Sequence, residues 1–91
     1  MASLPSATVQ PSPDVVSRRL GDSAVLVHLE TNRVFELNET GARVWELLRE
    51  GRTCEQIVER LVAEFDVEPG QASSTLLELL GDLRREGLLQ P

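Results

Sequence analysis

The stretch from Thr31 to Leu48, TNRVFELNETGARVWELL, decides the fold of this chain. Thr31 and Asn32 predict a turn, because asparagine tolerates a positive φ angle. Residues 33–37 then alternate between charged and apolar, as a half-exposed strand does. Asn38 is a good helix N-cap, and apolar residues recur at helical spacing after it. The stretch therefore predicts a strand, a turn and an amphipathic helix, and it carries no catalytic motif.

The sequence on both sides extends this pattern. Residues 15–20 and 23–29 are strand-like and are separated by a Gly-Asp turn, so three short antiparallel strands are expected. Thr53 and Gln56 form a capping box for a second helix. Pro69 lies near the start of a third helix, which should close at Gly87. The predicted fold class is α+β: a winged-helix-like, three-stranded antiparallel sheet followed by three helices.

The first 13 residues differ in composition from the rest. They are rich in serine, proline and alanine, which predicts a flexible tail over residues 1–13 and a single domain over residues 14–91. The tail lacks the charged start and apolar block of a signal peptide, and no apolar run is long enough to span a membrane. A cytoplasmic protein is expected.

Charge and chemistry exclude several function classes. The net charge of −6 argues against nucleic-acid binding, which needs lysine and arginine to neutralise phosphates. The chain has one cysteine, Cys54, and one histidine, His28, so neither a disulfide nor a metal cluster is expected. Its glycines stand singly, and its acidic residues are scattered over helix surfaces. We expect no catalytic residue, no metal and no cofactor.

A binding groove is the alternative that the pattern favours. The strand from Arg33 to Leu37 has no proline, glycine or lysine to protect a free edge. The third helix has one leucine stripe at Leu76, Leu79 and Leu83 and a second at Leu77 and Leu80. If the second stripe lies beside the free edge, the two form a groove for an extended peptide. If other helices bury both stripes, no groove exists, and spacing alone leaves the two arrangements open.

Three segments together resemble the PqqD-like family, the RiPP precursor-peptide recognition elements. They are HLETNRVFELNETGARVWELL, EGRTCEQIVERL and LLELLGDLRREGLL, and the resemblance spans about residues 15–89. It implies a non-catalytic domain that binds the leader segment of a ribosomally made precursor peptide, antiparallel to the third strand and against the third helix. The residues that would bind the peptide are Arg33, Val34, Phe35, Glu36, Leu37, Leu76, Leu77, Leu80, Leu83 and Arg84.

The expected function is an adaptor that presents the leader to a modifying enzyme. The chain is most similar to the stand-alone partner of a lasso-peptide leader peptidase. Alternatives are a pyrroloquinoline quinone peptide chaperone that serves a radical SAM enzyme, a winged-helix DNA-binding domain, and a structural subunit that docks through its leucine face. No nucleic acid or membrane partner is expected, and a weak homodimer through the edge strand is left open.

Overall fold

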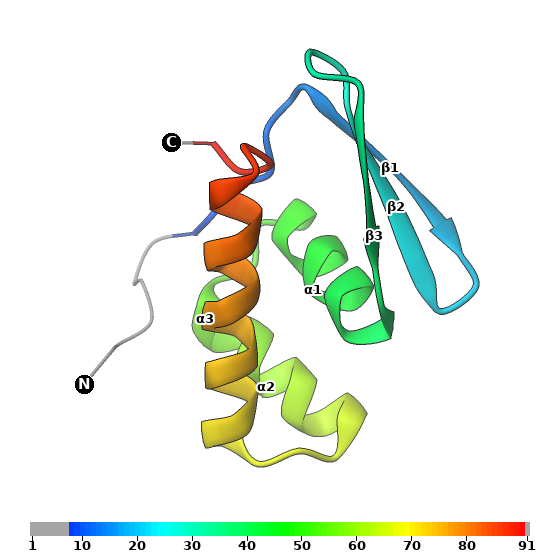
Figure 1. Ribbon diagram of the computed structural model, residues 1–91. Coiled ribbons are helices and arrows are strands. Elements are labelled where there is room, and N and C mark those ends of the chain that lie inside the picture. Colours follow the sequence, from blue (N-terminus) through cyan, green and yellow to red (C-terminus); the bar gives the residue numbers. More distant parts are fainter. Residues whose placement is uncertain (1–7, 91) are drawn as a thin grey trace.

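The computed structural model describes residues 8–90 and consists of a sheet followed by three helices (Figure 1). The strands are β1 (Val15–Leu20), β2 (Ser23–His28) and β3 (Arg33–Leu37). The helices are α1 (Glu39–Arg49), α2 (Cys54–Phe65) and α3 (Pro69–Arg85). The predicted α+β class and element order are confirmed.

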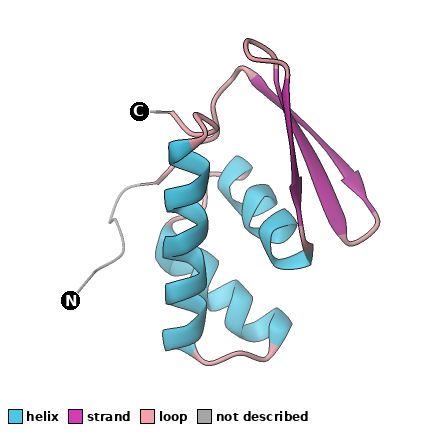
Figure 2. Ribbon diagram, viewed as in Figure 1, coloured by secondary structure: helices cyan, strands magenta, loops and turns pink. Residues whose placement is uncertain are grey.

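The sheet is an antiparallel meander with the order β1-β2-β3, so β1 and β3 are both edge strands. Turns set the hairpins: Gly21 and Asn32 adopt positive φ angles of 63° and 59°. Only one face of β2 is buried, through Ala24, Leu26 and His28. That face carries α1, which lies between the sheet and the other two helices (Figure 2).

Local signals in the sequence start the first two helices as expected. The Asn38 side chain accepts a hydrogen bond from the Gly41 N–H at 2.9 Å. Thr53 and Gln56 form both bonds of the capping box at the start of α2. Each such cap stabilises a helix by about 1 kcal/mol, because it satisfies N–H groups that have no partner within the helix.

The core is built from one face of each helix and of the sheet. Its largest fully buried side chains are Leu26, Leu47, Leu48, Ile57, Leu61, Leu76 and Leu88. Leu88 and Leu89 lie after α3 and are both buried, so the chain folds back onto the core there.

The expected boundary near Asp14 differs from the structure. Val9 is buried in the core, and Pro11 forms a β-bridge with Leu89. The Ser12 N–H donates to the Leu88 carbonyl at 2.9 Å. Proline-rich composition suggested a tail here, but prolines also suit a short extended segment that pairs through its carbonyls. The first seven residues of the predicted tail lie outside the described part of the chain.

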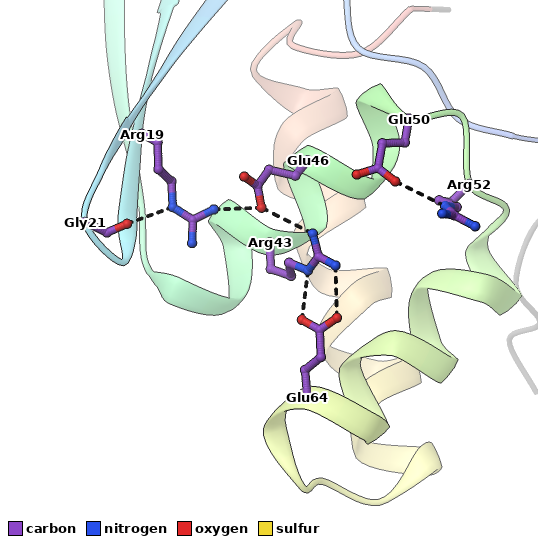
Figure 3. A network of polar contacts seen from close by, with 7 residues as sticks. All are labelled: Arg19, Gly21, Arg43, Glu46, Glu50, Arg52 and Glu64. Carbon is purple, nitrogen blue, oxygen red and sulfur yellow. Dashed lines mark hydrogen bonds and ion pairs between the residues drawn. The ribbon is translucent and has the colours of Figure 1, made fainter.

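A chain of ion pairs ties the sheet to α1 and α2 (Figure 3). Arg19 on β1 lies 2.7 Å from Glu46 on α1. Glu46 also contacts Arg43, whose guanidinium makes two bonds, of 2.8 and 3.0 Å, to the Glu64 carboxylate on α2. The network lies away from α3, so it fixes the sheet on α1 without crossing the surface between β3 and α3.

Candidate functional site: a groove between β3 and α3

A groove of about 390 Å³ lies between the edge strand β3 and the helix α3. Its apolar lining comes from both elements and from the residues after α3, and three carboxylates accompany it. The lining residues are Phe35, Glu36, Leu37, Asn38, Gly41, Leu79, Asp82, Leu83, Glu86 and Leu88. An open strand edge therefore has an apolar groove directly beside it.

The hydrogen bonds beside β1, at the far edge of the sheet, show which backbone groups of β3 are free. The Leu29 N–H donates to the Asp14 carbonyl at 2.8 Å, so the polar backbone groups of Leu29 face β1. Because these groups alternate along an antiparallel strand, those of Ala24, Leu26 and His28 face β3. The Asn32 N–H indeed donates to the His28 carbonyl at 2.8 Å.

The register between β2 and β3 completes this argument. Ala24, Leu26 and His28 are paired with Leu37, Phe35 and Arg33. The backbone groups of those three β3 residues therefore face β2. The N–H and C=O groups of Val34 and Glu36 point away from the sheet, toward a strand that is not there.

The side chains of β3 alternate between the two faces of the sheet. Phe35 and Leu37 face the groove, and Phe35 is half-buried while Leu37 is 8% exposed. Val34 lies on the outer face of the sheet and is 65% exposed. An added strand would meet free backbone groups at Val34 and Glu36 and apolar side chains at Phe35 and Leu37.

One ion pair closes the end of the groove where β3 begins. Arg33 Nη1 lies 2.9 Å from Glu86 Oε2, without hydrogen-bond geometry, and the guanidinium lies over the Phe35 ring at 5.1 Å. With exposed fractions of 62% and 30% for the two side chains, this pair contributes little to stability. The Arg33 guanidinium is therefore a cation beside the groove, and it is already paired with the Glu86 carboxylate.

The opposite end of the groove is closed by the start of α1, where Gly41 lies close to Leu37 and Asn38. A Cβ atom on Gly41 would lie 3.3 Å from both the Asn38 Oδ1 and the Leu37 Cβ atoms. Any larger residue would therefore press on the N-cap and on the last residue of β3.

The structure divides the leucines of α3 between the core and the groove. Leu76 and Leu80 lie in the core with exposed fractions of 0% and 4%, and neither belongs to the groove lining. Leu77 is half-buried and Arg84 is exposed, and neither lines the groove. Leu83 does line it, together with Leu79, which was not among the predicted peptide-binding residues.

Three groove residues on α3 and at its C-cap were not predicted from the sequence. Leu79, Asp82 and Glu86 follow one another at spacings of three and four, which places them on one helix face with Leu83. The mixed composition of this face, two leucines and two acids, was the signal that could have identified it. A groove wall that is apolar at its base and charged at its rim has this composition.

Cys54 has the properties of a core residue. Its side chain is fully buried, and this burial raises the pKa of the thiol, although the charge of Arg84 opposes the shift. The thiol therefore stays protonated near neutral pH and is a poor nucleophile. No group of three or more metal-ligating side chains occurs within residues 8–90.

These features define a small α+β domain with a groove beside an open sheet edge. The family model described as "Coenzyme PQQ synthesis protein D (PqqD)" matches residues 23–89, so the chain belongs to the PqqD family. RiPP recognition elements of this family are non-catalytic peptide-binding domains. The predicted family and the prediction that the chain is not an enzyme are both confirmed.

Two solved structures are similar to this chain over most of their length. One is described as "TbiB1 in Complex with the TbiA(beta) Leader Peptide"; it is 37% identical, with 89% of this chain and 94% of that chain covered and a TM-score of 0.85. The other, "Lasso peptide synthetase B1 complexed with the leader peptide", is 22% identical, with coverages of 93% and 100% and a TM-score of 0.85. The second similarity establishes the shared fold. No curated protein matches the chain.

None of the helices within residues 8–90 has the length and apolar content that crossing a bilayer requires.

Proposed function

We propose that this chain binds the leader segment of a ribosomally made precursor peptide as an antiparallel strand added to β3, and presents it to a modifying enzyme. The observation that carries the proposal is the pair of outward-facing backbone positions, Val34 and Glu36, beside the groove. Family membership supports it, as does the 37% identity to a protein whose structure is described with a leader peptide.

The energetics of the groove suit a specific but reversible contact. Two apolar side chains seated against Phe35, Leu79 and Leu83 would contribute about 1.5–3 kcal/mol each. Ordering an extended peptide offsets part of this gain, and the backbone hydrogen bonds add modestly. The result is an affinity in the micromolar range or better, sufficient to raise the effective concentration of the peptide at an enzyme that binds the complex.

The enzyme that we propose as the partner is the leader peptidase of lasso-peptide biosynthesis. The overall similarity of the sequence to the stand-alone proteins of that pathway supports it. A pyrroloquinoline quinone peptide chaperone remains the second candidate, because the matching family model bears that description. Cleavage of a lasso precursor that accelerates when this protein is added would support the first. Stimulation of a radical SAM enzyme alone would support the second.

The decisive experiment for strand addition is a proline substitution at the free edge. We would titrate this protein into the fluorescein-labelled leader of the precursor peptide encoded beside its gene and follow anisotropy. Val34→Pro removes an N–H that faces away from β2, so the β2–β3 ladder stays intact and the circular dichroism spectrum should not change. Binding should fall at least tenfold.

The matched control is Val34→Thr, which keeps both the N–H and the β-branched shape. It should bind the leader with nearly the wild-type affinity. A Val34→Pro variant that is folded and still binds normally would contradict strand addition on β3.

A further inference from the structure

Three acidic residues lie at the groove, and the partners of their carboxylates differ. Glu86 is paired with Arg33 at 2.9 Å, and Asp82 with Arg85 at 3.1 Å. Glu36 forms no ion pair with any described residue. Among residues 8–90, Glu36 is therefore the one acidic residue at the groove whose carboxylate has no ion-pair partner.

The position of Glu36 in the sheet explains why no cation reaches it. Its side chain lies on the outer face, where its neighbour on β2 is Val25, and Arg18 follows on β1. Two strand spacings, about 10 Å, separate the backbones of Glu36 and Arg18. The place directly beside Glu36 on its other side is the open edge, where an added strand would lie.

We propose that the peptide bound by this groove carries a lysine or arginine directly opposite Glu36. The proposal rests on the function proposed above and specifies its ligand. Opposite charges at directly facing positions of an antiparallel pair attract, and like charges repel. A cation on the added strand would give Glu36 the partner that the fold lacks, so Glu36 selects peptides by charge while the groove selects apolar side chains.

The register predicts the rest of the pattern. In an antiparallel added strand, the residues opposite Leu37 and Phe35 point into the groove and should be apolar. The residue opposite Val34 lies on the outer face, where Val16 and Val27 continue the same row across the sheet. A β-branched residue fits there. Read from its N-terminus, the ligand has the pattern apolar, Lys or Arg, apolar, β-branched.

The test is a selection from phage-displayed random 12-residue peptides on the immobilised wild-type protein and on two variants, Glu36→Lys and Arg18→Gln. Wild-type protein should enrich the four-residue pattern. Glu36→Lys should replace the Lys or Arg preference at the second position by Asp or Glu. Arg18→Gln, on the same face at the far edge, is the matched control and should keep the wild-type preference.

A synthetic peptide with the enriched pattern then gives the size of the effect. Replacing its cation by glutamine should weaken binding about 1.5- to 5-fold, the range for a facing charge pair, and glutamate should weaken it further. Apolar alternation with no charge preference, or a preference that Glu36→Lys leaves unchanged, would overturn the proposal for Glu36 alone. Selection of no peptide, or of peptides that still bind Val34→Pro, would overturn strand addition as well.

Discussion

The pair formed by Arg43 and Glu64 shows how single residues hold this small domain together. The two side chains meet from α1 and α2, and the guanidinium contacts both carboxylate oxygens. This hydrogen bonding lowers the pKa of Glu64, while partial burial acts in the opposite direction. The same bonds raise the pKa of Arg43, which stays charged at every relevant pH. The pair fixes the angle between two helices whose shared core is short.

Stability should depend on pH through this pair. Because the folded-state pKa of Glu64 lies below the unfolded value of about 4.3, the contribution is complete above that value and is lost as pH falls through the folded pKa. With 34% of the Glu64 side chain exposed, solvent screening limits the effect of Glu64→Gln at pH 7 to less than about 1 kcal/mol. Urea unfolding at pH 7 and pH 3 measures it.

The difference between wild type and Glu64→Gln should shrink at pH 3. Glu59→Gln, an exposed position on the same helix outside the ion pairs, is the control and should show a smaller difference at pH 7. If Glu64→Gln lowered the free energy of unfolding equally at both pH values, the loss would come from packing and not from charge.

At the scale of elements, α3 shows what sequence reasoning could and could not predict. The helix, its proline start and its termination just before Gly87 follow from local chemistry. Its rotation does not, because leucines at 76, 77, 79, 80 and 83 spread over nearly half of its circumference, more than one core-facing stripe needs. Tertiary contacts decide it: Ala72, Leu76, Leu80 and Leu83 are buried, and Leu79 faces the groove. The strand residues of the site were predictable because β3 has a period of two.

Two glycines in and after α3 should respond in opposite ways to alanine. A Cβ atom on Gly81 meets nothing within 4 Å, so Gly81→Ala should raise the free energy of unfolding by about 1 kcal/mol through helix propensity. Gly87 has a φ angle of 74°, which alanine adopts with strain, so Gly87→Ala should destabilise. Chemical denaturation of both variants tests this. Stabilisation by both would mean that α3 continues past residue 87.

At the scale of the whole molecule, the segment before β1 belongs to the domain. Val9 is in the core and residues 10–12 pair with residues 88–90. A chain that begins at Asp14 should therefore be less stable than one that begins at Thr8, by about 1.5–3 kcal/mol for the valine alone. Thermal unfolding compares the two. Equal melting temperatures would show that residues 8–13 contribute nothing to folding.

The single tryptophan gives a probe that separates two surfaces of the molecule. Trp45 is 2% exposed and lines a second hollow, between residues 10–13, β1 and α1, instead of the β3–α3 groove. Because the chain has no tyrosine, emission reports Trp45 alone. A peptide bound to β3 should leave this emission unchanged while the anisotropy of its own label rises. A shift in tryptophan emission on binding would place the peptide at the hollow beside β1.

The bridge between Pro11 and Leu89 has a consequence for how this domain can be joined to other proteins. Residues 10 and 90 are hydrogen-bonded neighbours, since the Gln90 N–H donates to the Gln10 carbonyl at 2.8 Å. A short linker would therefore connect these two ends, and opening the chain at the Gly21 turn would give a circular permutant with the same sheet order. For the same reason, the domain could be inserted into a surface loop of a host protein. The two points of attachment would lie only about one strand spacing apart.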